Sequence, residues 1–583
     1  MAERYYIGIG STFHDPSLAI VDGEGNVLFA EASERHYQNK RAIGLPADNI
    51  IWSSKIIEQY CASGAQYVIS ASWSNTYIKR LKRISAFGLL KSPPSALVTY
   101  YLQNIYRSIL PADNLLWLLN KHLGSLISAG KSLEYTLRRD FKKNNISKIN
   151  FDHHDTHAAL ACYGSDIKRA VCMVADGGGE EGSMSAYKYV NGRIELLYRQ
   201  RSPESLGFFY ALLTDCCGFD PIKGEEWKVM GLAPYGKYDE KIFNLLKSFF
   251  YVEKSRLRYN ITSKVLNKTL EALRAVSLSS KDGIAAIADI AYAGQMAYEN
   301  WMDELLQDLY KRNISENLVL TGGCALNSTY NGKILQQTAF KHLFVPSAPG
   351  DDGNSLGAAL LAYHNDHPTS KPADRILTPY LGSEIKNDSL AHFLKFSKIE
   401  KIRHLPNTIC EETAKLLAEG KLVAWVQGKA EFGPRSLGNR SILADPRPED
   451  MKDKINGRVK FREEFRPFAP SILHEYGNEY FEDYQESPYM ERTLAFRKSV
   501  IHKVPAVVHV NNSGRIQTVK REWNARYHDL IKAFFELTGV PILLNTSFNV
   551  MSKPIIHTLE DAISVFYTSG LDIMVINDYI IEK

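Results

Sequence analysis

The stretch that decides the fold lies close to the start of the chain and reads Tyr5-Tyr6-Ile7-Gly8-Ile9-Gly10-Ser11-Thr12-Phe13-His14-Asp15-Pro16-Ser17-Leu18-Ala19-Ile20-Val21. Two apolar runs flank a short connection of glycine, hydroxyl and charged residues, which predicts a strand, a turn and a second strand. The small and hydroxyl-bearing residues of the connection would let backbone amides approach a phosphate.

A comparable hairpin is predicted at residues 171–190, where the run Val174-Ala175-Asp176 enters the three glycines Gly177 to Gly179. Mixed strands and helices follow each hairpin, so the chain looks duplicated. A duplicated α/β (mixed) chain of this kind is typical of the actin-like and sugar-kinase-like (ASKHA) nucleotide folds, in which the ligand lies in the cleft between the halves. Two unrelated hairpins would give the same local pattern.

A candidate metal site begins at Asp152-His153-His154-Asp155-Thr156-His157. In a helix, His153 and His157 lie one turn apart on one face, where a single ion reaches both imidazoles. With 16 histidines in 583 residues, about 0.4 such pairs arise by chance, so the spacing alone is weak evidence. It needs support from other residues.

Two aspartates supply that support. Asp176 follows an apolar strand, and Asp351 stands in an Asp-x-Gly turn before an apparent helix. Two imidazoles and two carboxylates form a mixed nitrogen and oxygen ligand set, which suits Fe²⁺, Mn²⁺ or Zn²⁺ better than a thiolate site would.

The composition is that of an ordinary globular protein, with 45% hydrophobic and 23% charged residues among 583. This length predicts two or three domains. A net charge of +5 is too small to indicate a nucleic-acid partner. Seven cysteines without a Cys-x-x-Cys motif favour a reducing cytoplasm. We expect no signal peptide, and the uncharged segment 92–106 is too short to span a membrane.

The domain boundary is expected near residue 380, where glycine-rich turns give way to a polar segment. We therefore divide the chain into domains 1–380 and 381–583. Residues at about 75–145 are rich in Leu, Tyr, Lys and Arg, which predicts an amphipathic helical insertion that caps a cleft or makes a dimer contact. A long helix is predicted over residues 283–310, behind the N-cap candidate Asp282.

Two glycine-containing segments are candidates for contact with a nucleotide. The run 214–237, which contains Lys228, is interrupted by Gly and Pro too often for a regular element, so it is either a phosphate-facing loop or a tightly turned core connection. The run 321–327, which contains Gly322 and Gly323 and ends at Asn327, is a strand-to-helix junction of the type that holds a nucleotide.

Basic residues stand beside Gly, Ser and Asn in several turns beyond residue 420. This combination suits bidentate binding of phosphate and carboxylate groups. A surface of unrelated arginines is the alternative. The positions that carry the pattern are Arg435, Lys460, Arg466, Arg515, Ser547 and Asn549.

Taken together, these segments resemble the O-carbamoyltransferases of the nodulation and antibiotic-tailoring type (NodU/CmcH-like), over nearly the whole chain. The motifs that carry the resemblance are Phe13-His14-Asp15, residues 153–159, Lys228 to Gly236, Thr321 to Asn327, Gly433 to Ser441 and Leu543 to Asn549. The sequence departs from the family at Asn512-Ser513-Gly514, where Asp-Gly-Thr is common, and in a longer segment at 75–145.

The resemblance implies an N-terminal actin/kinase-like domain, related to the metal-dependent tRNA threonylcarbamoyl transferases, and a C-terminal YrdC-like domain. The YrdC-like domain would use ATP with Mg²⁺ to convert carbamoyl phosphate to carbamoyl adenylate and pyrophosphate. Its anions would be held by Arg435, Lys460, Arg466 and Arg515 with Ser547 and Asn549.

In the first domain, the resemblance implies an iron-like divalent metal on His153, His157, Asp176 and Asp351. His14, beside Asp15, is the best residue type for taking the proton of an acceptor hydroxyl. Lys228, Gly322, Gly323 and Asn327 are the expected nucleotide contacts of this domain.

We therefore expect an ATP-dependent O-carbamoyltransferase that acts on a hydroxyl of a secondary metabolite or sugar-like acceptor in the cytoplasm. The acceptor classes open to it are aminoglycosides, cephems, Nod-type oligosaccharides and saxitoxin-like alkaloids. One alternative is a tRNA threonylcarbamoyl adenosine-type enzyme, which requires a coherent basic face. The other is a nonenzymatic nucleotide-binding regulator. No membrane or nucleic-acid partner is expected, and a homodimer is open.

Overall fold

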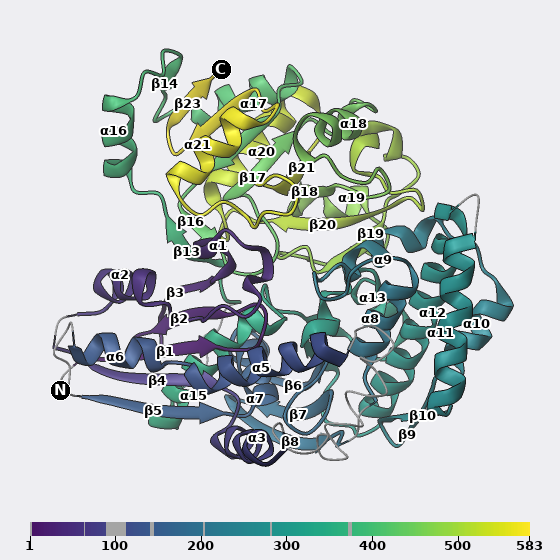
Figure 1. Cartoon of the computed structure of the whole chain (residues 1–583). Coiled ribbons are helices and arrows are strands. Elements are labelled where there is room, and N and C mark those ends of the chain that lie inside the picture. The colour runs from purple at the N-terminus through teal and green to yellow at the C-terminus, as the bar shows by residue number, and fades with distance from the viewer. Residues whose placement is uncertain are drawn as a thin grey trace. The chain divides into compact units, whose positions relative to one another are not determined.

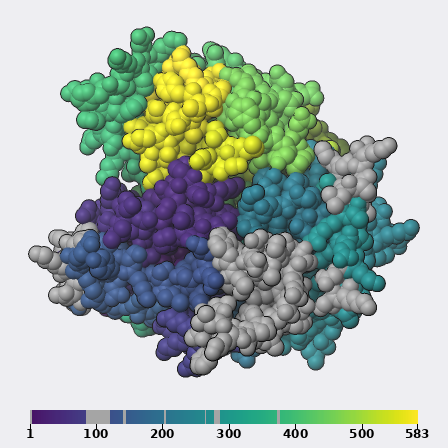
Figure 2. All heavy atoms as spheres, in the orientation of Figure 1, coloured from purple at the N-terminus to yellow at the C-terminus, as the bar shows by residue number. Residues whose placement is uncertain are grey.

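The computed structural model describes residues 3–62, 64–88, 112–139, 145–201, 204–279, 283–370 and 376–583. The described residues are coloured from purple to yellow in Figure 2. The N-cap candidate Asp282 and the segment 92–106 lie outside them. Among the described helices, none is both long and apolar enough to cross a membrane.

The chain divides into two compact units. The N-terminal unit comprises Met1–Glu34, Arg41–Leu326 and Ile334–Leu377, and the C-terminal unit comprises Arg35–Lys40, Asn327–Lys333 and Thr378–Lys583. Each unit has its own sheets, so each is described by itself.

The first sheet of the N-terminal unit has the strand order β3-β2-β1-β4-β5 (Figure 1). Its strands are β1 (Arg4–Gly10), β2 (Ser17–Val21), β3 (Val27–Ala32), β4 (Gln66–Ser72) and β5 (Ile146–Phe151). β1, β2 and β3 form an antiparallel meander, whereas β4 and β5 join β1 in parallel. The hairpin predicted for residues 5–22 is therefore confirmed.

The second sheet repeats this arrangement in the order β8-β7-β6-β11-β12. Its strands are β6 (Arg169–Ala175), β7 (Met184–Val190), β8 (Arg193–Arg199), β11 (Asn317–Thr321) and β12 (His342–Phe344). The first three strands again form a meander, and the last two again run parallel to the first. The shared topology confirms the predicted duplication.

Helix α15 (Asn354–Asp366) packs against β1, β2 and β4 and against α7 (His153–Tyr163) (Figure 1). Glycine makes this packing close. A Cβ atom on Gly357 would lie 1.9 Å from the carbonyl oxygen of Thr156, and one on Gly8 would lie 1.8 Å from that of Ser355. No side chain fits at either position, so α7, α15 and β1 approach backbone to backbone.

The remaining helices of the N-terminal unit lie between these strands in the chain. They are α2 (Ile50–Tyr60), α3 (Asn75–Gly88), α5 (Ala112–Ser128), α6 (Lys131–Arg139), α8 (Leu206–Cys216), α9 (Glu226–Leu232), α10 (Glu240–Lys247), α11 (Ser263–Ser279), α12 (Gly283–Tyr310) and α14 (Ile334–Gln337). The helix predicted at 283–310 is confirmed as α12. The part of segment 75–145 that the structure describes contains α3, α5 and α6.

The C-terminal unit is built on one mixed sheet in the order β14-β23-β22-β15-β17-β21-β18-β20-β19. These strands are β14 (Ile402–His404), β15 (Val423–Val426), β17 (Arg440–Ala444), β18 (Ala469–Leu473), β19 (Arg492–Ala495), β20 (Ser513–Val519), β21 (Ile542–Ser547), β22 (Ile573–Ile576) and β23 (Tyr579–Glu582). Helices α17 (Ile409–Ala418), α20 (Ala525–Thr538) and α21 (Leu559–Thr568) contribute apolar residues to the same core. The predicted mixed α/β class is confirmed.

Candidate metal centre and anion site

The two histidines of the predicted metal site lie on the first turns of α7. The side chain of Asp152 caps this helix by accepting hydrogen bonds from the amides of His154 and Asp155. Arg199 donates to both carboxylate oxygens of Asp152, at 2.8 and 2.9 Å. The rings of His153 and His157 are fully buried and lie edge to face, 4.8 Å apart between centroids. The predicted helical spacing therefore places both imidazoles on one face.

Asp176 enters the same site from the end of β6. Its Oδ2 atom lies 3.3 Å from Nε2 of His153, and its Oδ1 atom accepts a hydrogen bond of 2.9 Å from the amide of Gly323. The preceding Gly322 has a φ of +89°, and a Cβ atom there would lie 2.3 Å from the carbonyl oxygen of Ala175. Glycine at 322 lets the chain turn close to β6 and aim an amide at Asp176.

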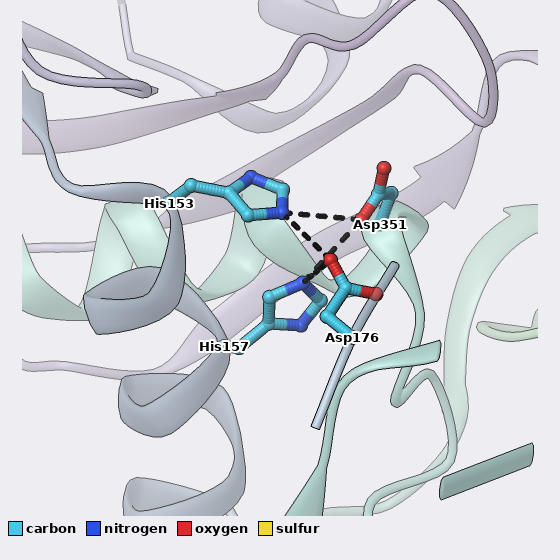
Figure 3. Close-up of side chains that lie close together, drawn as sticks. All are labelled: His153, His157, Asp176 and Asp351. Atoms are coloured by element: carbon cyan, nitrogen blue, oxygen red, sulfur yellow. Dashed lines mark hydrogen bonds and ion pairs between the residues drawn. The ribbon is translucent and has the colours of Figure 1, made fainter. Parts of the chain in front are cut away.

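Asp351 completes the set from the short 3₁₀ turn Asp351–Gly353, which leads into α15. Its Oδ1 atom lies 3.4 Å from Nε2 of both His153 and His157. One donor atom from each of the four side chains lies within 4.8 Å of the others. Figure 3 shows the four groups pointing toward one point from three separate segments.

The charges of this cluster fit a divalent cation. Burial would raise the pKa of Asp176, and Asp351 would raise it further, but hydrogen bonding and the nearby histidines lower it to about 2. Burial would lower the pKa of His153, but Asp351 and Asp176 raise it to about 10. Two largely buried carboxylates thus favour a positive charge between them, which a proton on His153 supplies without a metal. A cation bound by two nitrogen and two oxygen donors would supply it better.

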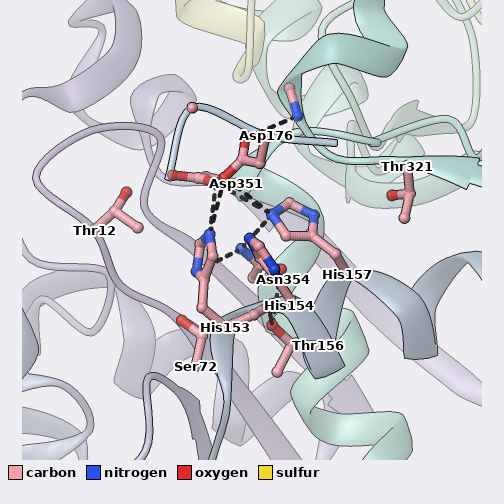
Figure 4. Close-up of polar contacts among 12 residues, drawn as sticks. Thr12, Ser72, His153, His154, Thr156, His157, Asp176, Thr321, Asp351 and Asn354 are labelled. Atoms are coloured by element: carbon pink, nitrogen blue, oxygen red, sulfur yellow. Dashed lines mark hydrogen bonds and ion pairs between the residues drawn. The ribbon is translucent and has the colours of Figure 1, made fainter. Parts of the chain in front are cut away.

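Sequence reasoning did not identify Asn354 as part of this site. Its Oδ1 atom accepts a hydrogen bond of 2.8 Å from Thr156, and its Nδ2 atom lies 3.4 Å from Nδ1 of His153 and 3.2 Å from Nε2 of His157 (Figure 4). Asn354 is fully buried. The only signal in the sequence is its position at the start of the helix that Asp351 opens. The amide fixes α15 and α7 to each other beside the ligands.

His14 and Asp15, which the sequence predicted to be catalytic, lie next to the candidate metal ligand Asp351, and their catalytic role stays a prediction. Nδ1 of His14 lies 2.8 Å from Oδ2 of Asp15 and 3.7 Å from Oδ2 of Asp351. Arg41 donates to Oδ2 of Asp15 through Nε and Nη2, at 3.2 and 3.1 Å. Burial opposes the charge of Asp15, but Arg41 and His14 lower its pKa to about 2. An ionised Asp15 therefore orients the His14 ring.

The residues expected to contact a nucleotide in the N-terminal domain make different hydrogen bonds and ion pairs with other parts of the protein. Gly323 binds Asp176 through its amide, as described above. Nζ of Lys228 lies 2.7 Å from the carboxylate of Glu225 and 5.2 Å from the ring centre of Phe219. Asn327 accepts a hydrogen bond of 3.1 Å from the amide of Tyr330 and caps the short helix α13 (Ser328–Asn331) of the C-terminal unit. Their role as nucleotide contacts stays a prediction.

In the C-terminal unit, Lys460 lies at the end of a π-helical turn (Asn456–Lys460) and reaches the end of β21. Its ammonium donates to Oδ1 of Asn549 at 2.7 Å, to the carbonyl oxygen of Asn549 at 3.0 Å and to the carbonyl oxygen of Ser547. Oγ of Ser547 donates to Oδ1 of Asn549 at 2.8 Å. Three of the predicted anion-binding residues therefore form one hydrogen-bonded group.

Two of the predicted arginines, Arg435 and Arg466, act electrostatically on the third, Arg515. Burial, followed by the charges of Arg435, Arg462 and Arg466, holds the pKa of Arg515 well below its usual range. Burial alone lowers the pKa of Arg435 to about 10. Nη1 of Arg466 donates to Glu463 at 3.3 Å, whereas the buried Nε of Arg515 has no hydrogen-bond partner within the described residues. Such mutual repulsion is relieved when an anion binds between the cations.

Arg462 belongs with these arginines, although the sequence analysis did not single it out. Burial and the neighbouring Arg466 lower its pKa to about 9, and Glu463 opposes this shift only in part. Its guanidinium lies 4.1 Å from the ring centre of Phe468, and its Nε donates to Oδ1 of Asn456 at 3.0 Å. The frequent basic residues between positions 458 and 466 were the available signal. The cation cluster is the set Arg435, Lys460, Arg462, Arg466 and Arg515.

Two family models match the chain. The model described as carbamoyltransferase N-terminus matches residues 5–360, and the model described as carbamoyltransferase C-terminus matches residues 414–583. The four candidate metal ligands lie in the first match, and the cation cluster lies in the second.

Curated relatives extend this similarity over the full chain. Nodulation protein NolNO of Sinorhizobium fredii is 33% identical over 590 residues, which span 99% of this chain and 80% of that protein. The uncharacterized protein sll1178 of Synechocystis is 31% identical over 625 residues, which span 99% of this chain and 97% of that protein. The 3'-hydroxymethylcephem-O-carbamoyltransferase of Amycolatopsis lactamdurans is 34% identical over 264 residues, which span 45% of this chain and 48% of that enzyme.

Proposed function

The chain belongs to the carbamoyltransferase family, and from that premise we propose that it is an ATP-dependent O-carbamoyltransferase. The donor is carbamoyl phosphate, the activated intermediate is carbamoyl adenylate, and the acceptor is a hydroxyl of a small molecule. The names of two relatives, a nodulation protein and a cephem O-carbamoyltransferase, support an acceptor of the secondary-metabolite or sugar-like class.

The cation cluster of the C-terminal unit supports the activation step. Carbamoyl phosphate loses its phosphate to water, and an oxygen of the resulting carbamate attacks the α-phosphorus of ATP with Mg²⁺. The products are carbamoyl adenylate, pyrophosphate and phosphate. The carbamate and the phosphate-bearing species are all anions, so largely half-buried cations whose charges oppose one another at Arg515 are suited to bind them. We assign binding to Arg435, Lys460, Arg466 and Arg515, with Ser547 and Asn549 fixing Lys460.

The metal centre of the N-terminal unit supports the transfer step. His153, His157, Asp176 and Asp351 would hold a divalent ion, for which we propose Fe²⁺, with Mn²⁺ or Zn²⁺ as alternatives. When bound, such an ion polarises a carbonyl or phosphoryl oxygen as a Lewis acid.

His14 has the geometry of a general base in this step. Its Nδ1 atom donates to the ionised Asp15, which leaves the lone pair of Nε2 to accept the proton of the acceptor hydroxyl. The hydroxyl oxygen then forms the new bond to the carbamoyl carbon, and the bond to AMP breaks. Arg41 and the carboxylate of Asp15 keep the imidazole in the required tautomer. A carbamoyl group is a poor electrophile until such a leaving group is attached.

The observation that carries this proposal is the convergence of four metal-ligand side chains beside the His14 and Asp15 pair. The test is to incubate the full chain with radiolabelled carbamoyl phosphate, ATP and Mg²⁺ and to separate the nucleotide products. We expect AMP and pyrophosphate. Formation of ADP with no AMP would contradict the proposal. A mass-shift screen of hydroxyl compounds, searching for a gain of one carbamoyl group, would then identify the acceptor.

A further inference from the structure

The geometry points to Trp73 as a positioning residue that fixes the ring of the metal ligand His153. The inference rests on the metal site of the proposed function and concerns how the chain prepares that site. Trp73 was not among the residues that the sequence indicated.

The indole of Trp73 stacks on the imidazole of His153. The ring centroids lie 4.3 Å apart at an interplanar angle of 27°. Both residues are almost completely buried, with exposed fractions of 4% and 0%. Nδ1 of His153 has only the 3.4 Å approach of Asn354 within the described residues, and its Nε2 faces Asp176 and Asp351. The stacked indole covers one face of the ring and so restrains its plane.

The backbone of Trp73 is in a strained conformation. Its φ of +72° lies in the left-handed region, which is an outlier for a bulky residue and marks a functional constraint. Three contacts keep this conformation. The carbonyl oxygen of Trp73 accepts a hydrogen bond of 3.0 Å from Asn150, and the next residue, Ser74, donates to Glu180 through Oγ at 2.5 Å and through its amide.

The indole is also packed against two further rings. Tyr77 of α3 stacks with it at 5.1 Å, and His122 of α5 meets it edge to face at 5.0 Å. Nε1 of Trp73 is buried and has no hydrogen-bond partner within the described residues, so hydrogen bonding does not explain why tryptophan stands here. Packing of the flat indole against Tyr77 of α3, His122 of α5 and His153 therefore accounts for tryptophan at this position.

The consequence is that His153 is oriented before a metal arrives. A ligand that is already aligned loses less conformational freedom on binding, and groups that orient metal-bound histidines typically affect metal affinity by about 10–100-fold. We expect replacement of the indole by a flexible side chain to reduce affinity in this range. An aromatic replacement should preserve most of it.

The experiment titrates Co²⁺ into the chelator-treated full chain and follows both Co²⁺ absorption and tryptophan fluorescence. Trp73→Leu should weaken Co²⁺ binding by about 10-fold or more, and Trp73→Phe should restore it to within about threefold of the unsubstituted chain. Quenching of tryptophan fluorescence by Co²⁺ should be largely lost in Trp73→Phe although the metal still binds. That signature follows from the short distance between the indole and His153.

The matched control is Trp52→Leu, because Trp52 lies in the same unit and packs against the core of the first sheet. It should leave Co²⁺ affinity and quenching unchanged. Ser74→Ala, which removes one anchor of Trp73 without altering any charge, should weaken binding by a smaller factor than Trp73→Leu. Trp73→Leu binding Co²⁺ as tightly as Trp52→Leu would overturn the inference. Failure of the unsubstituted chain to bind Co²⁺ would instead overturn the metal site itself.

Discussion

Nδ1 of His14 lies 2.8 Å from Oδ2 of Asp15, and the same carboxylate oxygen accepts two hydrogen bonds from Arg41. This places a histidine with a defined tautomer beside Asp351, one of the four candidate metal ligands. Both residues of the pair come from the turn that joins β1 to β2.

Asp15→Asn should slow transfer to the acceptor, because the neutral amide no longer stabilises the imidazolium that forms when His14 takes the proton. General base catalysis typically contributes about 10²–10⁴-fold, so we expect a loss of at least about 100-fold in the transfer rate. Formation of AMP and pyrophosphate in the C-terminal unit should be unchanged. Single-turnover measurement with the screened acceptor tests this, with His364→Gln, a half-buried histidine of α15, as control. An unaltered transfer rate would exclude Asp15 from the step.

Asp351→Asn should sharply reduce metal retention, because it removes a charged donor that lies 3.4 Å from both histidines. Elemental analysis should find about one divalent ion per unsubstituted chain and about tenfold less in the variant. Treating the unsubstituted chain with a chelator, removing the chelator and then supplying Mg²⁺ with ATP should stop transfer but leave pyrophosphate formation intact. Asp352→Asn, next in the chain, is the control. Equal metal content in the two variants would count against the four-residue site.

Arg515→Met should stabilise the C-terminal unit when no ligand is bound. It should also remove the stabilisation that pyrophosphate gives to this unit. Burial and the charges of Arg435, Arg462 and Arg466 disfavour the Arg515 cation, and its Nε has no partner within the described residues. We expect the Tm without ligand to rise by about 2–4 °C. Pyrophosphate, which should raise the Tm of the unsubstituted chain, should have little effect on the variant.

The control for this prediction is Arg521→Met, since Arg521 lies in the same unit but is exposed and pairs with Asp529. It should keep the full response to pyrophosphate. A response of equal size in Arg515→Met would show that Arg515 does not bind the anion. Differential scanning fluorimetry measures both quantities.

Glu180 should make the stability of the metal-free chain depend on pH. Burial, together with the charge of Asp152, raises its pKa to about 7 from an ordinary value of 4.5. The folded state therefore binds more protons than the unfolded state between pH 4.5 and 7, and the contribution of Glu180 to stability is lost as the pH rises through this range. Glu180→Gln stays neutral at every pH. Its free energy of unfolding should therefore increase by about 2 kcal/mol relative to that of the unsubstituted chain as the pH rises from 4.5 to 7.

The comparison uses chemical denaturation at several pH values. Glu181→Gln, on the same turn but in an exposed ion pair with Arg201, should track the unsubstituted chain throughout. If the stability difference between Glu180→Gln and the unsubstituted chain stays constant from pH 4.5 to 7, the pKa of Glu180 is not raised.

Much of this architecture could be predicted from local patterns. Alternating apolar runs and glycine turns identified both hairpins, and the spacing of His153 and His157 identified one face of α7. Strand ends and turns then identified Asp176 and Asp351 as their partners, because such positions project side chains toward a shared edge. These features depend on residues close together in the chain.

The residues that sequence reasoning missed depend on distant contacts. Asn354 acquires its role only because Gly357 lets α15 approach α7, and Trp73 acquires its role from a left-handed backbone conformation that its own sequence does not favour. Arg462 is directed into the cation cluster by the π-helical turn that ends at Lys460. Neither helix-to-helix distance nor a strained φ is encoded in residue spacing.

The repeated sheet topology has a consequence for how the two chemical tasks can be altered separately. The two meanders are equivalent by strand order, yet the turn of the first carries His14 and Asp15, whereas the turn of the second carries Asp176 and Glu180. We expect the first hairpin to accept a proton through His14 and the second to bind a cation through Asp176. Because each turn is held by the strands of its own sheet, a substitution that changes proton transfer at the first turn need not change the metal affinity of the second.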